Sequence, residues 1–188
     1  MANKTTVSLT AEQYEEIINT MLTGGSGFRS NSRIATALVL EANLGLRIED
    51  ILNLHLEDII RDGSRYRLDI TEQKTGKKRT FTVPFQIYQY IENYCLKNNI
   101  AANEIIFPTT ERNVQKYLKK VTDYLAYDNI GTHSFRKYYA TDIYNSNGHD
   151  IVLVQSLLQH SSSSTTQRYI GITQEKIESA IQGHVHLI

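Results

Sequence analysis

The chain has 188 residues, of which 40% are hydrophobic and 21% are charged, as is usual for a single globular domain. Basic and acidic residues number 20 each, so the net charge is zero and lacks the basic excess common in DNA-binding domains. The single cysteine, Cys95, excludes an intrachain disulfide and a cysteine-rich zinc site, and we expect it to fill space in the core. No apolar run reaches membrane-spanning length and the N-terminus has no signal-like apolar core, so we expect a cytoplasmic protein without a membrane partner.

Apolar residues at helical spacing predict three helices in the first third of the chain. Thr10 and Gln13 form a capping-box pattern that marks the start of the first helix. Gly45 ends the second helix, and Arg47 then stands at the start of the third. The predicted ranges are 11–22, 31–44 and 48–54.

The next section changes to the two-residue period of a β-strand. Residues 65–70 alternate between apolar and charged side chains, and 79–83 supplies a partner strand. Residues 75–77 have good turn chemistry, so the two strands form a hairpin that presents Lys74 near its tip. Residues 56–60 are a candidate third strand.

The second half of the chain again shows helical periodicity. The fold class that follows is mainly α with a small antiparallel β-sheet (α+β), in one domain. A short tail after these helices, 174–182, has a small apolar face. The predicted helical ranges are 86–97, 111–126, 134–146, 150–158 and 164–170.

Four side chains able to act on a phosphate gather in the stretch 132–170. His133 and Arg136 stand three residues apart, so on a helix they share a face. His160 closes an apolar run, and Tyr169 follows nine residues later. Taken singly, a histidine–arginine pair is more often a solvated surface pair, and Tyr169 is one of twelve tyrosines.

The order of these residues, together with two sequence motifs upstream, resembles the pattern of the tyrosine recombinase (phage integrase) family. The family pattern runs G-L-R-x-x-E-L-x-x-L, a lysine on a β-hairpin, H-x-x-R, L-L-G-H, and a tyrosine about nine residues on. The sequence G-L-R-I-E-D-I-L-N-L at 45–54 matches the first box, and E-Q-K-T-G-K-K-R-T-F-T-V-P at 72–84 matches the second. The likeness covers roughly residues 8–180, and it departs from the pattern at Gln159, where the family has glycine.

The resemblance implies the DNA breaking-rejoining fold and a tyrosine site-specific recombinase, which integrates, excises or inverts DNA. Tyr169 would attack a DNA phosphodiester and form a 3′-phosphotyrosine, which keeps the bond energy for religation without ATP, a metal or another cofactor. Arg47 and Arg136 would offset the charge of the transition state, because a guanidinium gives paired donors to phosphate oxygens.

The remaining site residues also come from the resemblance. Lys74 would protonate the leaving oxygen, His133 would act as general base or hold the phosphate, and His160 would donate a hydrogen bond to it. The expected partner is double-stranded DNA, bound in part by the cations that follow Lys74. These DNA-binding candidates are Lys77, Lys78 and Arg79.

We expect residues 1–188 to form one catalytic domain, with a core from about 8 to 170 and a tail from 171 to 188. The sequence holds no counterpart of the N-terminal DNA-clamping domain of larger relatives, so it is either a fragment or one of the short relatives. In the family such a tail docks on a neighbouring protomer of a tetramer on DNA; packing on its own domain is the alternative. Without DNA we expect a monomer or weak oligomer. His184 and His186 alone are too few ligands for a metal site.

Three other functions stay open from the sequence. A catalytically silent DNA-binding module would bind DNA without cutting it, and a topoisomerase IB-like enzyme would use a similar site to relax supercoils. A helical interaction protein with no role on DNA is favoured only by the zero net charge.

Overall fold

The computed structural model describes residues 6–74, 76–160 and 162–172, without the side chains of Arg79 and Arg168. Helices dominate this part of the chain, and three antiparallel strands form its sheet, as the fold class predicts. The helices are α1 (Ala11–Thr23), α2 (Ser32–Leu44), α3 (Ile48–Leu52), α4 (Phe85–Lys97), α5 (Glu111–Tyr124), α6 (Thr132–Ser146), α7 (Ile151–Leu158) and α8 (Ser163–Tyr169). The strands are β1 (Ile59–Asp62), β2 (Arg65–Thr71) and β3 (Lys78–Val83).

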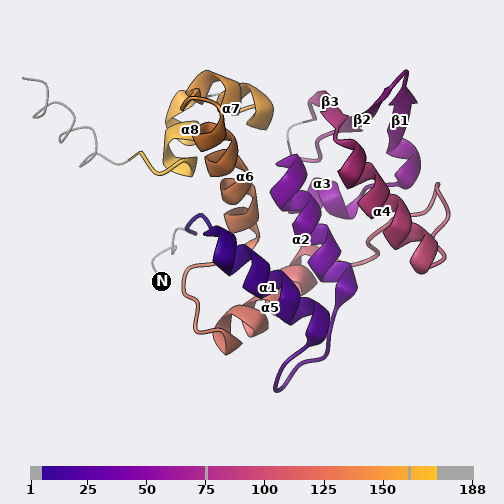
Figure 1. Cartoon of the computed structure of the whole chain (residues 1–188), viewed down its shortest axis with the longest axis vertical. Coiled ribbons are helices and arrows are strands. Elements are labelled where there is room, and N and C mark those ends of the chain that lie inside the picture. The colour runs from indigo at the N-terminus through magenta and orange to yellow at the C-terminus, as the bar shows by residue number, and fades with distance from the viewer. Residues whose placement is uncertain (1–5, 75, 161, 173–188) are drawn as a thin grey trace, which may run out of the picture.

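Helix α2 runs through the middle of the molecule, with the sheet on one side and the last three helices on the other (Figure 1). Helices α1 and α5 lie below it in this view, and α4 lies against the sheet, where Tyr66 of β2 stacks on Tyr88 at 3.9 Å between ring centroids. Among the described residues, no helix is both long and apolar enough to cross a bilayer.

Two hydrophobic clusters hold these elements together. The larger one joins α1, α2, α3, α5 and the sheet, and it contains Cys95, which is buried as predicted. The smaller one lies between the second half of α6, α7 and α8, where Ala140, Val154 and Leu158 are fully buried. Tyr169 packs against this smaller cluster, so the position of its ring depends on the last three helices.

Side chains cap the N-termini of the first two helices. Thr10 accepts a hydrogen bond from the Gln13 backbone N–H at 3.2 Å, and the Gln13 side chain accepts one from the Thr10 N–H at 3.1 Å. Asn31 caps α2 by accepting from the Ile34 N–H at 3.1 Å. The predicted capping box is therefore confirmed.

The sheet has the order β1-β2-β3, and the predicted hairpin of β2 and β3 is confirmed, with Leu68 opposite Phe81. The third strand exists but begins later than predicted, because Leu56–Asp58 form a 3-10 turn. The Asp58 carboxylate accepts from the His55 N–H at 2.7 Å, which closes that turn before β1 starts.

Several helix boundaries also differ from the predicted ones by a few residues. Helix α5 ends at Tyr124 because Ala126 takes a left-handed conformation with φ 56°. Helix α6 begins at Thr132, two residues earlier than predicted, so His133 lies in its first turn. The predicted apolar face at 174–182 lies outside the described residues, as do His184 and His186, which follow it.

Gly45 is required at the junction between α2 and α3. It takes the left-handed conformation with φ 59°, and a Cβ there would overlap the Tyr139 ring of α6. Gly45 thus lets α6 approach the backbone two residues before Arg47.

We predict that Gly45→Ala lowers the free energy of unfolding by about 2 kcal/mol or more, because left-handed strain adds to the clash with Tyr139. Gly63→Ala is the matched control, since Gly63 has φ 62° but no neighbour within 4 Å, and it should cost only about 1 kcal/mol. Urea denaturation measures both. Equal losses for the two variants would show that the Tyr139 contact is unimportant.

Gln159 ends α7 in the left-handed conformation with φ 52° and ψ 36°. This backbone conformation accounts for the glycine of the L-G-H pattern, because glycine adopts it without steric cost. The Gln159 Oε1 atom is buried and accepts no hydrogen bond from any residue the structure describes. Gln159 therefore lowers the stability of the fold in two ways, through its strained backbone and through the burial of its Oε1 atom without a hydrogen bond.

We predict that Gln159→Gly stabilises the fold by about 0.5–1 kcal/mol, because relief of both costs outweighs the greater unfolded-state entropy of glycine. Gln167→Gly is the control, since the same change within α8 should destabilise by about 1 kcal/mol. Thermal and urea unfolding give both values. A loss of stability for Gln159→Gly would contradict the argument.

Candidate active site

Arg47 and the turn of the hairpin are fixed to each other through buried carboxylates. Arg47 is the N-terminal cap residue of α3, and its Nη1 donates to Glu72 Oε2 at 2.5 Å. Glu72 has a side chain only 1% exposed, so this ion pair is largely shielded from water. Asp50 Oδ1 accepts from the Gln73 backbone N–H at 2.8 Å, and the two contacts dock the residues just before Lys74 against α3.

Three of the six predicted catalytic residues line one pocket of about 270 Å³. Arg47 comes from the start of α3, Lys74 from the hairpin turn and His133 from the first turn of α6. Two acidic side chains, Glu49 and Glu111, line the same pocket. The pocket thus combines a guanidinium, an ammonium and an imidazole, which suits an anionic group bound within hydrogen-bond reach.

Arg136 lies one turn after His133 on α6 and is almost fully buried, with 1% of its surface exposed. Its Nη2 donates to the Leu158 carbonyl oxygen at 2.9 Å, at the C-terminal end of α7. A cation is favoured at this end of a helix, where carbonyl groups lack intrahelical partners. Arg136 therefore connects α6 to the segment that carries His160.

Burial of the imidazole away from water lowers the pKa of His133, and the nearby cations Arg136, Lys74 and Arg47 lower it further. Although the residue as a whole is exposed, its ring faces this cluster of positive charge. The neutral imidazole, which accepts a proton, is therefore favoured at neutral pH.

His160 and Tyr169 contact each other, and neither lines the first pocket. Their rings meet edge to face, with centroids 4.8 Å apart and an interplanar angle of 75°. His160 Nδ1 lies 3.0 Å from the Thr166 hydroxyl, and its backbone N–H donates to the Gln155 carbonyl at 3.1 Å. These contacts fix the imidazole between α7 and α8.

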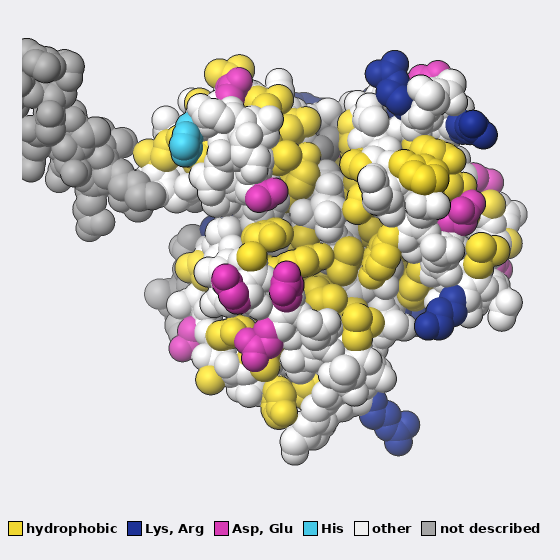
Figure 2. All heavy atoms as spheres, viewed as in Figure 1, with side chains coloured by type: hydrophobic (Ala, Val, Ile, Leu, Met, Phe, Trp, Pro, Cys, Tyr) yellow, Lys and Arg dark blue, Asp and Glu magenta, His cyan; other side chains and the backbone are white. Residues whose placement is uncertain are grey.

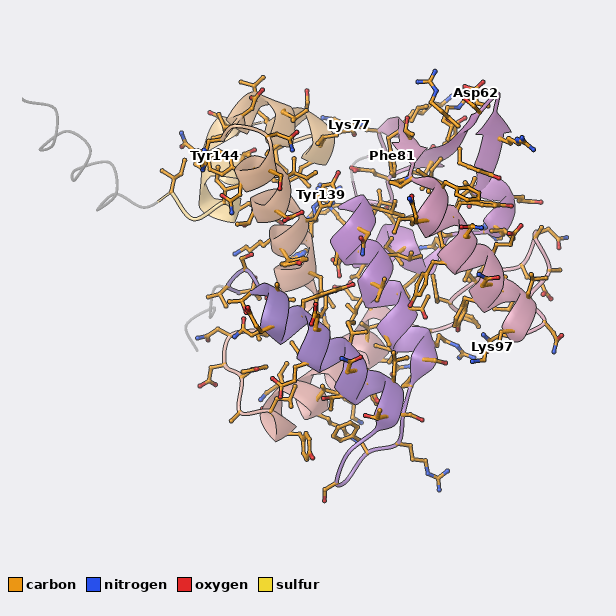
Figure 3. All side chains as sticks on the ribbon, in the orientation of Figure 1. Asp62, Lys77, Phe81, Lys97, Tyr139 and Tyr144 are labelled. Carbon is orange, nitrogen blue, oxygen red and sulfur yellow. The ribbon has the colours of Figure 1, made fainter. Side chains whose placement is uncertain are left out.

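Two lysines of the hairpin face α7. Lys77 and Lys78 line a second pocket of about 660 Å³ together with His160 and residues of α7. Figure 3 shows Lys77 between the hairpin and α7. The side chain of the third predicted DNA-binding residue, Arg79, is outside the described set.

Four acidic residues near the site were missed by the sequence analysis: Glu41, Asp50, Glu72 and Glu111. Burial raises the pKa of Glu41 well above its usual value, although the charge of Arg136 opposes this. Burial and the neighbouring Glu49 also raise the pKa of Glu111. Glu41 lies seven residues after Ile34 on the apolar stripe of α2, and that position was the one sequence signal of its burial.

Figure 2 shows how charged and hydrophobic side chains are distributed over one face of the molecule. Acidic side chains gather there over α1, hydrophobic ones occupy the centre, and lysine and arginine stand at the edge. The acidic and basic residues, 20 of each, are thus unevenly distributed over this face.

Comparisons with known proteins identify the family of the chain. The model of the phage integrase family matches residues 7–176. The probable integrase/recombinase YoeC of Bacillus subtilis is 31% identical over 157 residues, which cover 80% of this chain and 83% of YoeC. Tyrosine recombinase XerA of Pyrococcus furiosus is 26% identical over 93% of this chain, but the match spans only 60% of XerA.

Solved structures share the fold. A structure of the XerH recombinase bound to palindromic difH substrate matches with a TM-score of 0.68 and 20% identity, over 96% of this chain and 54% of that one. The catalytic domain of bacteriophage HP1 integrase matches with a TM-score of 0.63 and 15% identity, over 94% of each chain. The solved structures confirm the predicted fold. The family model and the relatives confirm the predicted enzyme class, and the chain belongs to the phage integrase family, as a tyrosine recombinase catalytic domain.

Proposed function

We propose that this chain cuts and rejoins double-stranded DNA at defined sites through a covalent 3′-phosphotyrosine on Tyr169. The main support is that Arg47, Lys74 and His133, which are distant in sequence, line one pocket. Arg136 links the start of α6 to the end of α7, from which His160 reaches Tyr169. The proposal treats 1–188 as one catalytic domain, with its core at about 8–170.

Charge neutralisation comes from Arg47 and Arg136 in this scheme. The scissile phosphate would lie between the two guanidinium groups, which would stabilise the added negative charge of the pentacoordinate transition state. Glu72 holds Arg47 and the Leu158 carbonyl holds Arg136, so both donors are preorganised before DNA binds. Removing either guanidinium should slow cleavage by on the order of a hundredfold.

His133 and Lys74 transfer protons in this scheme, and His160 binds the phosphate. Neutral His133 would accept the phenol proton as Tyr169 attacks, and Lys74 would give a proton to the leaving 5′-oxygen. His160 would donate a hydrogen bond to a non-bridging oxygen. In the reverse direction the 5′-hydroxyl attacks the phosphotyrosine and the strands are joined.

The partners of the chain are also proposed from its relatives. Solved structures with this fold include XerH bound to difH substrate and the Tn1549 transposon integrase in complex with circular intermediate DNA. We propose that this chain also binds double-stranded DNA, and that Lys77, Lys78 and Arg79 contact the DNA backbone. Assembly into a tetramer on DNA, through the tail at 171–188, belongs to the same proposal.

Covalent trapping tests the proposal. We expect the wild-type chain, incubated with fragmented DNA from its own source and denatured in SDS, to keep DNA attached at a few defined sequences. Tyr169→Phe should bind DNA equally well yet give no adduct, because it lacks only the nucleophilic oxygen. Sequencing the attached DNA identifies the sites.

Each rival function gives a different result in that experiment. Adducts scattered over all sequences would favour a topoisomerase IB-like enzyme. DNA binding without any adduct, also in a longer chain that includes flanking sequence, would favour a silent DNA-binding module and overturn the proposal.

The pH dependence of cleavage tests the role of His133. Its lowered pKa means that the free chain keeps a neutral base below pH 6.5, the usual histidine value, and loses it only in more acidic solution. We therefore predict that the second-order rate of adduct formation falls on the acid side of pH 6.5, with a limb that His133→Gln removes. A rate that rises as the pH falls would instead show that an imidazolium holds the phosphate.

A further inference from the structure

Lys137 is a buried lysine next to Arg136 that the proposed chemistry does not use. It is only 8% exposed, and lysine is rarely buried without partners. Its ammonium donates to the backbone carbonyl of Thr6, and Nζ lies 5.5 Å from the centroid of the Tyr169 ring. The ammonium is therefore held between the N-terminal segment and the proposed nucleophile.

The segment that carries the Thr6 carbonyl is itself fixed. The Val7 N–H donates to the Asn129 carbonyl at 3.1 Å, and the Ser8 and Thr141 hydroxyl groups lie 3.3 Å apart. Thr6 is thus anchored on both the loop before α6 and α6 itself, which restricts where the Lys137 ammonium can lie.

We propose that Lys137 is a positioning residue for Tyr169, whose ammonium holds the phenol ring and stabilises the phenolate as it forms. A cation within about 6 Å of the centroid is attracted to the face of an aromatic ring. Deprotonation spreads negative charge into the ring, so the attraction is stronger for the phenolate than for the phenol. An interaction that strengthens as the nucleophile ionises lowers the barrier to attack.

This inference rests on the proposed function, and it moves no proton through Lys137. The phenol proton leaves to the general base, and the ammonium keeps its own. Two other titratable groups face the pair: His160, in edge contact with the Tyr169 ring, and His133, whose pKa Lys137 helps to lower. Burial lowers the pKa of Lys137 itself from its usual 10.5, so the test is run between about pH 6 and 9.

Two substitutions of Lys137 distinguish the effect of its positive charge from the effect of its side-chain size. Lys137→Met removes the ammonium but keeps a long side chain, and Lys137→Arg keeps a cation and a donor. Lys97→Met is the matched control, because Lys97 is an exposed lysine at the end of α4, on the other side of the molecule (Figure 3).

Single-turnover adduct formation and DNA affinity are measured for each variant. We expect Lys137→Met to slow adduct formation by about tenfold throughout that pH range, because the variant lacks the charge that stabilises the forming phenolate. DNA affinity should match that of Lys97→Met, and Lys137→Arg should restore most of the rate. Equal rates for Lys137→Met and Lys97→Met at every pH would overturn the inference, as would a parallel loss of rate and affinity that arginine does not rescue.

A second readout does not depend on catalysis. With 3-fluorotyrosine placed at position 169, fluorine NMR follows the phenol titration directly, and we expect its pKa to rise in Lys137→Met but not in Lys97→Met. Lys137→Gln takes the place of Lys137→Met if the methionine variant does not fold. A wild-type chain without a Tyr169-dependent adduct would overturn the proposed function, while an unchanged phenol pKa would overturn the role of Lys137.

Discussion

The buried guanidinium of Arg136 is the constraint on which the site depends. A charge with 1% exposure is costly unless its donors are used, and the Leu158 carbonyl at the end of α7 takes one of them at 2.9 Å. That bond holds α7 against α6, so the smaller hydrophobic cluster forms where it can carry Tyr169. A residue proposed to bind phosphate thus also joins the two parts of the catalytic machinery.

Acidic residues organise the other half of the site. Glu72 and Asp50 are buried and hold Arg47 and the Gln73 backbone, so the hairpin turn places Lys74 in the pocket that Arg47 and His133 also line. Half of the charged residues in the chain are acidic, and Glu72 and Asp50 are two that hold other parts of the fold in place. The zero net charge, which counted against a DNA-binding function, is compatible with a local group of cations such as Lys77 and Lys78, which line the second pocket without an acidic neighbour among its described lining residues.

Much of the fold was predictable because its signals are local. Capping at Thr10, the alternation along β2 and the glycine at position 45 each depend on a few neighbouring residues. The six candidate residues were found by their order, not by geometry, and the sequence carried no sign of what holds them. Contacts such as Glu72 with Arg47, or Lys137 with Thr6, join distant segments, and burial of a charge cannot be seen until the fold encloses it.

The central claim is that Tyr169 itself forms the bond to DNA. Digestion of the purified covalent adduct with protease and nuclease, followed by mass spectrometry, measures this most directly. The account predicts one modified peptide, with a nucleotide linked through its 3′-phosphate to Tyr169. A nucleotide on another side chain, or one attached through its 5′-phosphate, would contradict it.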